Sequence, residues 1–503
     1  VLLFYALLRR LQRHTGFALL GALAYTLFSA DTTQAFLTHS LGLQPSLTLL
    51  LLSLHSWLSD RRVLSYLLAF VILFAYESPF PVFLAAPLLD SDWDASLVRK
   101  AVRHTVVVGL LLGAAAMVKA MAGEERVTGL GVADILLTPL NHMVVGPAAS
   151  FATFALRPLE VIVNLRAEVL VAVGVALVVF SWVLTREDIG PSSALADSVA
   201  WIRSRVRETR DAPHTAIPPG KVPAPLQLRL AAAGLAMWVL AYPLTFTTLG
   251  YHIRGRPTRV HLAAVVGASL VVASVGTAAV RSVKSRAGRR RCLIGVAAWL
   301  ALLAGYGFVL QRDYVRAWEL EKGFWVRLLP LVQDAGQGSV ILVDPAGIAD
   351  TYQIAANTWN LPRVLEQLYT IPAGWTDPPR VYRLTENWAD TILDQDGKFV
   401  LNETTTVAPP SLYGSFLARQ VILIETEGGQ WTRRLGALTL GARTVTLEPG
   451  KGTVLDSAGH SELYNLLIGS TGADSGGAKG RLRRMEGNGP EGTSVETRRS
   501  CHE

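Results

Sequence analysis

Hydrophobic runs separated by short polar segments fill the first 310 residues of the chain. A membrane core about 30 Å thick needs about 20 apolar residues in a helix, and fewer where protein packs around it. The runs therefore predict a polytopic α-helical membrane bundle with about nine full spans and a partial first one. The expected spans are residues 1–8, 17–29, 43–58, 62–76, 79–90, 102–120, 166–184, 226–250, 260–280 and 292–310.

Arginine and lysine gather in alternate loops of this predicted bundle. Cytoplasmic loops of membrane proteins carry an excess of these residues. With the spans above, the basic groups all fall on one side, which we expect to be cytoplasmic. The loops 30–42, 121–165 and 251–259 are then external, and 185–225 is a cytoplasmic linker. The basic groups are Arg9, Arg10 and Arg13; Arg61 and Arg62; Arg99, Lys100 and Arg103; Arg203 to Arg210; and Arg281 to Arg291.

Two of these loops are predicted to contain helices. The external loop 121–165 is moderately apolar and interrupted by glycine and proline, which indicates short helices lying in the membrane interface. The linker 185–225 is polar and ends in a proline-rich stretch, with one short amphipathic helix expected near residues 201–207.

The pattern changes after residue 310, where residues 311–468 predict a small external α/β domain. Short apolar runs bounded by turn residues are typical of buried strands. Residues 469–503 are rich in Gly, Ser, Arg and Glu, and we expect a disordered tail. The expected strands are 339–344, 381–384, 416–425 and 437–447, and the expected helices are 313–329 and 360–369.

Composition supports a membrane protein. Only 17% of the 503 residues are charged and the mean hydropathy is +0.34, whereas soluble domains carry roughly 25% charged residues. Residues 1–310 hold 28 Lys and Arg against 16 Asp and Glu, so the basic excess belongs to the hydrophobic part and favours membrane topology over nucleic-acid binding. Two cysteines exclude a disulfide scaffold. Because Val1 already lies inside an apolar run, we expect the true N-terminus to lie upstream.

Glu77 is the first candidate for a binding residue. It lies in the sequence Tyr76-Glu77-Ser78-Pro79, at the expected external turn between two short spans. A carboxylate at the membrane boundary is costly and usually has a partner. Glu77 therefore contacts either the substrate or a Lys or Arg that does, or it is simply solvated in the turn before a helix that begins at Pro79.

An external loop with three arginines, Arg254, Arg256 and Arg259, is the second candidate. Three arginines on the external side run against the positive-inside trend. Guanidinium groups bind phosphate oxygens well, so a lipid-linked phosphate at the outer leaflet would explain them. Anionic headgroups or ion pairs with the following domain are the alternatives.

Asp31 is the third candidate, because it follows the span 17–29 and precedes a polar stretch. It either lines an external cavity or caps the N-terminus of an interfacial helix. No phosphate-loop, dinucleotide, zinc-protease or Gly-x-Ser-x-Gly motif appears in a fitting context. We expect no cofactor and no metal site; a divalent ion bound by an Asp and backbone oxygens would leave no sequence signal.

These features together resemble the GT-C superfamily of polytopic membrane glycosyltransferases, including its protein mannosyltransferase-like and lipid A arabinosyltransferase-like groups. The matching elements are the polar turn Ser29 to Thr33, the Leu-rich span ending at Arg62, the span ending in Tyr76-Glu77, the Arg254–Arg259 loop and the helix from Tyr314 to Trp325. In that superfamily the acidic catalytic residue lies in the first external loop, which would precede Val1. The resemblance therefore assigns no catalytic residue in this chain, which we expect to be an N-terminally truncated fragment.

Two functions follow as hypotheses. The resemblance implies a glycosyltransferase that moves a sugar from a polyprenyl-phosphate donor to an unknown acceptor at the outer face, with Glu77, Asp31, Arg254, Arg256 and Arg259 as candidate substrate-binding residues. Its partners would be the lipid-linked sugar and membrane lipids, with no nucleic acid. The alternative is a non-catalytic membrane scaffold or binding protein that presents the α/β domain. Both place the chain in a membrane, by resemblance the bacterial inner or plasma membrane, with the C-terminal domain outside.

Overall fold

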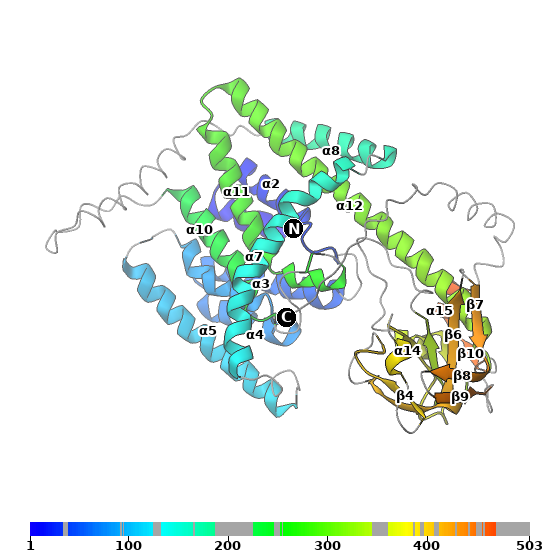
Figure 1. The fold of residues 1–503 in the computed structure, drawn as a ribbon. Helices are drawn as coiled ribbons and strands as arrows, with labels where there is room; N and C mark the ends of the chain where they lie inside the picture. The colour runs from blue at the N-terminus through cyan, green and yellow to red at the C-terminus, as the bar shows by residue number, and fades with distance from the viewer. Residues whose placement is uncertain are drawn as a thin grey trace. The chain divides into compact units, whose positions relative to one another are not determined.

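The chain is mostly helical, with a small C-terminal sheet region, and it divides into two compact units at residues 314 and 315 (Figure 1). The computed structural model describes residues 1–33, 39–90, 93, 95–123, 132–163, 166–186, 225–245, 252–253, 255–344, 361–385, 388–392, 397–406, 412–427, 430–440, 443–448, 455 and 458–468.

Four helices in the described part of the chain are long and apolar enough to cross a membrane. Nine spans are not confirmed, because several expected spans form shorter helices. At 1.5 Å per residue, a 14-residue helix is about 21 Å long, less than the membrane core. The four long helices are α5 (Ala95–Met121), α8 (Ala167–Arg186), α11 (Ala264–Ser282) and α12 (Arg286–Leu328). The shorter ones are α2 (Thr15–Thr26), α4 (Arg62–Ala75), η2 (Phe80–Leu89) and α10 (Leu226–Val239).

Glycine allows the closest helix packing in the first unit. A Cβ atom at Gly267 of α11 would lie 2.5 Å from the Gly234 carbonyl oxygen and 2.3 Å from the Trp238 backbone nitrogen of α10. Small residues let helix backbones approach in this way, which is a common mode of packing in membranes. The core of this unit also includes α1 (Leu2–Leu11) and α3 (Gln44–Leu58).

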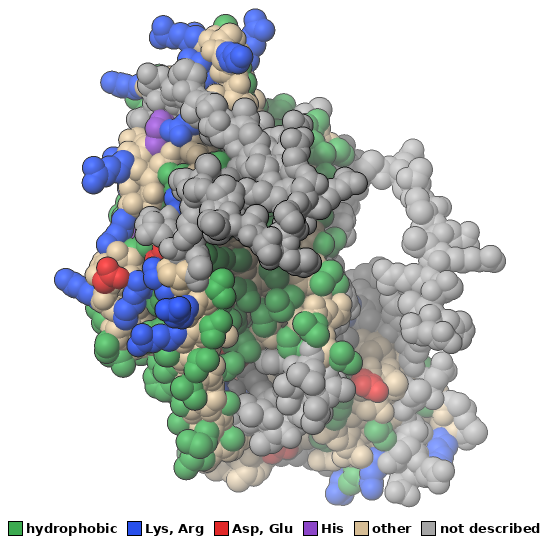
Figure 2. All heavy atoms as spheres, turned by 90° about the vertical axis from the view of Figure 1, so that its left-hand side faces the viewer, with side chains coloured by type: hydrophobic (Ala, Val, Ile, Leu, Met, Phe, Trp, Pro, Cys, Tyr) green, Lys and Arg blue, Asp and Glu red, His purple; other side chains and the backbone are tan. Residues whose placement is uncertain are grey.

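The surface of this unit matches a lipid environment. Helix α5 carries exposed Val102, Val106, Leu110 and Met117. On the face shown in Figure 2, hydrophobic side chains cover a broad area, and Lys and Arg gather along one edge. An exposed apolar area of this kind marks contact with lipid or protein.

The short helices expected within 121–165 are not found, because residues 132–163 form one 32-residue helix, α7 (Val132–Val163). It contains Pro139, Pro147 and Pro158, which the sequence analysis treats as helix breakers. Proline is tolerated in membrane helices because neighbouring groups re-satisfy the freed backbone positions.

Two further boundaries differ from the prediction. The expected span 226–250 stops at Val239 and leads into a turn that contains Pro243. The span 292–310 and the helix 313–329, expected as two elements, form the single 43-residue helix α12, followed by η4 (Leu329–Leu331). No residue in that interval breaks the helix before Pro330.

A four-stranded sheet forms the centre of the second unit, in the order β3-β1-β6-β7. Strand β1 (Val340–Val343) pairs in parallel with β3 (Arg380–Arg383) and β6 (Val421–Glu427), and β6 pairs antiparallel with β7 (Gln430–Arg434). All four β1 residues are buried, with Val340 and Leu342 in one cluster and Ile341 and Val343 in another. A central parallel strand is covered on both faces, and therefore reads as a continuous apolar run.

Other strands of this unit depart from the prediction. The run 416–425 is divided by η8 (Ala418–Gln420) into β5 (Gly414–Leu417) and β6, and 437–447 is a hairpin of β8 (Gly436–Leu440) and β9 (Arg443–Leu447). The expected helix at 360–369 is present as η6 (Leu361–Arg363) and α13 (Val364–Leu368). The strands and α-helices of this unit that were not predicted are β2 (Tyr369–Thr370), α14 (Trp388–Thr391), β4 (Lys398–Leu401), β7, β10 (Gly459–His460) and α15 (Glu462–Leu467). The helix near 201–207 and the tail 469–503 lie outside the described residues.

Candidate functional site

Asp31 lies in a turn after α2 and is only 2% exposed. Its Oδ1 accepts hydrogen bonds from the backbone nitrogen of Thr33 at 2.9 Å and from Oγ1 of Thr33 at 2.5 Å, the pattern of an Asx turn. Its Oδ2 has no hydrogen-bond partner among the residues that the structure describes. Residues 34–38, where a helix capped by Asp31 would lie, are outside the described part.

Burial changes the acidity of this carboxyl group. It raises the pKa of Asp31 to about 6, although the hydrogen bonds from Thr33 act in the opposite direction. A carboxyl group with a pKa near neutral is ionised at pH 7 and still accepts a proton readily. Such shifted groups are frequent at functional sites.

The arginine loop is fixed to the Asp31 turn by threonine hydroxyls. The Thr32 backbone nitrogen donates to Thr258 Oγ1 at 3.1 Å, and the two Oγ1 atoms lie 2.9 Å apart. Thr258 lies in η3 (Arg256–His261), and Gly255 before it has a φ of 69°, a left-handed conformation that favours glycine. Two turns more than 200 residues apart in sequence therefore form one structure.

Tyr314 adds a third segment to this cluster. Its hydroxyl group in α12 donates to the backbone oxygen of Thr32 at 2.6 Å. From the sequence, Tyr314 is expected only to form part of the helix 313–329. This hydrogen bond holds Tyr314 against the backbone of the turn that contains Asp31.

Tyr76 connects the cluster to the end of α4. Tyr76 lies within electrostatic range of the charged groups of Arg259, Glu77 and Asp31. We therefore describe these residues together as the Asp31 cluster.

Glu77 has the cationic partner expected for a carboxylate at a membrane boundary. Its Oε2 lies 3.5 Å from Lys119 Nζ near the end of α5, with the two side chains 31% and 22% exposed. Lys119 could not be selected from the sequence, because a single lysine at the end of an apolar helix is an ordinary feature.

The structure thus brings three of the five selected residues to one end of α4: Asp31, Glu77 and Arg259. Arg254 lies outside the described residues, and for Arg256 only the backbone position in η3 is described. The pair of Thr32 and Thr258 was not predicted, since no local sequence signal links two residues so far apart in the chain.

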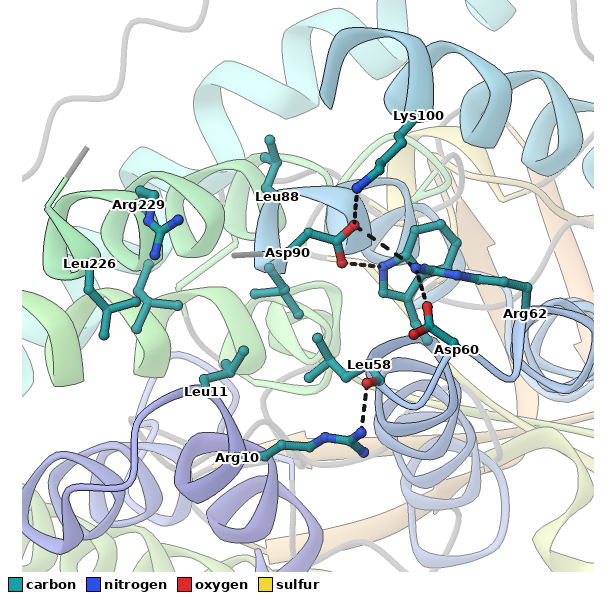
Figure 3. A pocket seen from close by; sticks show the side chains of 13 residues that line it. Arg10, Leu11, Leu58, Asp60, Arg62, Leu88, Asp90, Lys100, Leu226 and Arg229 are labelled. Carbon is teal, nitrogen blue, oxygen red and sulfur yellow. Dashed lines mark hydrogen bonds and ion pairs between the residues drawn. The ribbon is translucent and has the colours of Figure 1, made fainter. Parts of the chain in front are cut away.

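A cavity of about 550 Å³ lies at the other end of α4. It is bounded by Arg62, the first residue of α4, whereas Tyr76 caps the opposite end. Figure 3 shows its lining, which contains none of the five selected residues. This cavity is therefore distinct from the cluster around Asp31.

Metal ligands do not cluster in the part of the chain that the structure describes: no group of three or more His, Cys, Asp or Glu side chains could hold an ion there. The Asp31 cluster offers instead a carboxylate, a phenol and a guanidinium. Such groups can accept a proton and offset negative charge.

Comparison with known proteins adds no relative. No protein-family model matches the chain, and no curated protein or solved structure matches it.

Proposed function

We propose that the chain is a membrane glycosyltransferase that moves a sugar from a polyprenyl-phosphate donor to an acceptor hydroxyl group at the outer face of the membrane. One observation carries the proposal: Asp31 is buried, its pKa is raised to about 6, and its Oδ2 lacks a hydrogen-bond partner among the described residues. A carboxylate with a raised pKa and an oxygen that has no hydrogen-bond partner among the described residues can accept a proton as a general base.

Each group in the cluster has a role in this reaction. Oδ2 of Asp31 takes the proton from the acceptor hydroxyl as its oxygen attacks the anomeric carbon of the sugar. The bond from that carbon to the phosphate oxygen breaks, and the negative charge on the departing lipid phosphate is offset by Arg259. The hydrogen bonds of Thr32 with Thr258 and Tyr314 hold the Asp31 turn against the arginine loop.

The proposed location follows from the basic loops. Arg9, Arg10, Arg61, Arg62 and Lys100 belong to the end of the helices that carries the cavity, which the positive-inside rule assigns to the cytoplasm. The Asp31 cluster and the second unit then lie outside, which in a bacterium is the periplasmic side of the inner membrane.

A second function is favoured by the position of the cavity. The residues near Asp31 do not line the 550 Å³ cavity; if they bind no sugar donor, the first unit would serve as a membrane anchor, and the α/β unit would carry the binding function. The chain would then be a non-catalytic scaffold or binding protein.

The test is turnover of lipid-linked sugars by the purified full chain in lipid nanodiscs. A panel of synthetic polyprenyl-phosphate hexoses and pentoses is supplied, and release of polyprenyl phosphate is measured by mass spectrometry. Asp31→Asn should lower release about 100- to 10,000-fold, the usual contribution of a general base.

Glu168→Gln is the matched control, because Glu168 is an exposed carboxylate in the first turn of α8. It should release product at the wild-type rate. An Asp31→Asn variant that equals wild type would refute the role of Asp31, and no turnover of any donor would favour the scaffold.

A further inference from the structure

The cavity at the start of α4 combines a cationic rim with an apolar wall. Four cationic and two acidic side chains line it, an excess of two positive charges. The cations are Arg10, Arg62, Lys100 and Arg229, the acids are Asp60 and Asp90, and the apolar lining is Leu11, Trp57, Leu58, Leu88, Leu89, Leu226 and Leu230.

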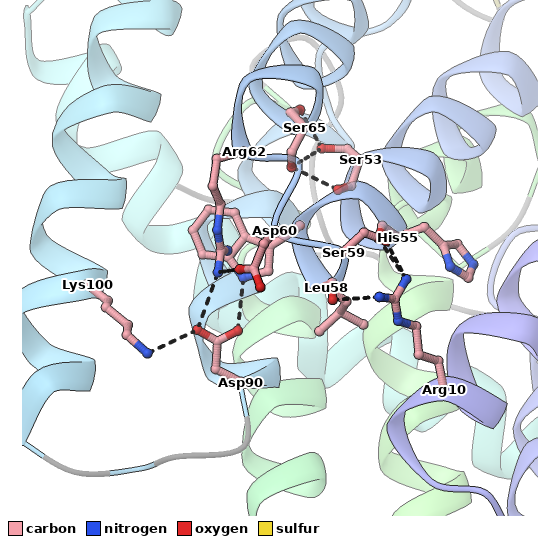
Figure 4. Close-up of polar contacts among 11 residues, drawn as sticks. Arg10, Ser53, His55, Leu58, Ser59, Asp60, Arg62, Ser65, Asp90 and Lys100 are labelled. Atoms are coloured by element: carbon pink, nitrogen blue, oxygen red, sulfur yellow. Dashed lines mark hydrogen bonds and ion pairs between the residues drawn. The ribbon is translucent and has the colours of Figure 1, made fainter.

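Asp90 holds two of the cations in place (Figure 4). Its Oδ2 lies 3.8 Å from Lys100 Nζ and 4.0 Å from Arg62 Nη2, and its Oδ1 accepts a hydrogen bond from Trp57 Nε1 at 3.3 Å. The two ion-pair distances exceed the range of a hydrogen bond. Asp90 therefore attracts Arg62 and Lys100 through charge without forming a hydrogen bond with Arg62 Nη2 or Lys100 Nζ.

Arg62 is held from two further sides. Its guanidinium lies 3.6 Å above the centre of the Trp57 ring, and Nη2 donates to Asp60 at 2.9 Å. Its Nη1 is buried and has no hydrogen-bond partner among the described residues. A guanidinium carries five donors in a rigid fork, and the Arg62 side chain, which is 34% exposed, brings its charge to the lining of the cavity.

Arg10 forms the opposite rim and is fixed by the end of α3. It donates to the backbone oxygens of His55 and Leu58 and to Ser59 Oγ. The cation thus binds carbonyl groups at the C-terminus of α3, where the last carbonyls of a helix lack a full set of intrahelical partners. Its charge still adds to the positive potential of the cavity.

We infer that this cavity binds an anionic amphiphile through its phosphate group, with the phosphate at Arg62 and Lys100 and the apolar chain along the leucines. A phosphate monoester carries about two negative charges near neutral pH, which matches the charge excess of the lining. Arginine and lysine are both phosphate-binding residues, and a purely aqueous anion would have no use for the apolar wall.

This site is separate from the one proposed for glycosyl transfer. Arg62 and Tyr76 lie at opposite ends of α4, and the 14 residues of that helix span about 21 Å. Binding at the cavity can therefore be tested without a donor sugar.

The experiment titrates the full chain in detergent with dioleoyl phosphatidic acid and follows its apparent melting temperature by tryptophan fluorescence. Dioleoyl phosphatidylcholine and inorganic phosphate are titrated in parallel. Phosphatidic acid should stabilise the wild type, and Lys100→Gln should weaken its binding about tenfold, the effect of one charge-assisted hydrogen bond. Lys100→Arg, which keeps the charge, should restore binding.

Arg103→Gln is the matched control, because Arg103 is exposed on α5 one turn from Lys100 and does not line the cavity. An equal loss in both variants, or equal stabilisation by phosphatidylcholine, would overturn the proposal in favour of headgroup attraction at the surface. Stabilisation by phosphatidic acid alone identifies a lipid ligand, and stabilisation by inorganic phosphate as well identifies a site for the phosphate group itself. No stabilisation by either overturns the inference. Should Lys100→Gln fail to elute as wild type on size exclusion, Arg62→Gln replaces it in the same titration.

Discussion

The carboxylates near the two ends of α4 differ in burial and in their charged neighbours: Asp31 is 2% exposed, whereas the side chain of Asp90 is 14% exposed and lies between two cations. Beyond the end of α4, Asp31 is held by two hydrogen bonds from Thr33, and its second oxygen has no hydrogen-bond partner among the described residues. At the start of α4, Asp90 lies within 4.0 Å of Arg62 and Lys100.

This difference distinguishes a site suited to proton transfer from a site suited to binding an anion. A carboxylate kept from water without a cationic partner favours its protonated form, and its pKa rises. A carboxylate between two cations instead orients them. The Asp31 end is therefore suited to proton transfer, and the Asp90 end to holding an anion.

Besides the loss expected for Asp31→Asn, the largest effect is expected from Arg259. Arg259→Gln should lower donor turnover about 100-fold or more, because it removes a charge that offsets the departing phosphate. Arg103→Gln, at the other end of the bundle, should leave turnover unchanged. The measurement is the initial rate of turnover of the lipid-linked donor. Equal rates for the two variants would show that Arg259 has no role in turnover that Arg103 lacks.

The pH dependence of stability should report the burial of Asp31. Its folded-state pKa of about 6 exceeds the ordinary value of 3.8, so the protonated group stabilises the folded state below pH 3.8, and this stabilisation is lost as the pH rises through 6. The loss amounts to about 3 kcal/mol.

Unfolding in detergent from pH 4 to 8 measures this effect. The free energy of unfolding of wild type should fall by that amount relative to Asp31→Asn, which has no ionisable group at the position. Parallel profiles for the two proteins would mean that Asp31 ionises as freely in the folded as in the unfolded state.

A smaller effect is expected from the threonine pair. Thr258→Val keeps the shape of the side chain but leaves the Thr32 backbone nitrogen without its acceptor, which should cost about 1–3 kcal/mol of unfolding free energy. Thr277→Val is the control, because Thr277 is buried in α11 and its Oγ1 has no hydrogen-bond partner among the described residues. That change should be neutral or stabilising, and denaturant unfolding compares the two.

The smallest effect is expected at the Glu77 ion pair. Both side chains are partly exposed, and such pairs contribute less than about 1 kcal/mol. Lys119→Gln should therefore change the melting temperature only slightly. A loss as large as that of Thr258→Val would show that Lys119 supports the Asp31 cluster directly.

The sequence was sufficient to locate the Asp31 turn and the Arg259 loop, because both interrupt apolar runs where polar residues are costly. It could not join them, since the contact between Thr32 and Thr258 depends on packing of helices more than 200 residues apart. The continuous sheet strand 340–343 was predictable because its burial on both faces leaves an unbroken apolar run.

The cavity was missed for a different reason. Arg62 and Lys100 read as ordinary loop charges that set membrane topology, and only the fold reveals that Trp57 and Asp90 hold Arg62 in place. The single helix α7 was missed because proline is weighed as a breaker in water, whereas neighbours in a bundle tolerate it.

The most direct test of the central claim is the pH profile of donor turnover by the wild-type chain. If Asp31 is the general base, turnover should rise as the pH increases through about 6, where its carboxyl group ionises, and then remain level. A turnover rate that is constant from pH 5 to 8 would contradict a role for Asp31 as the base.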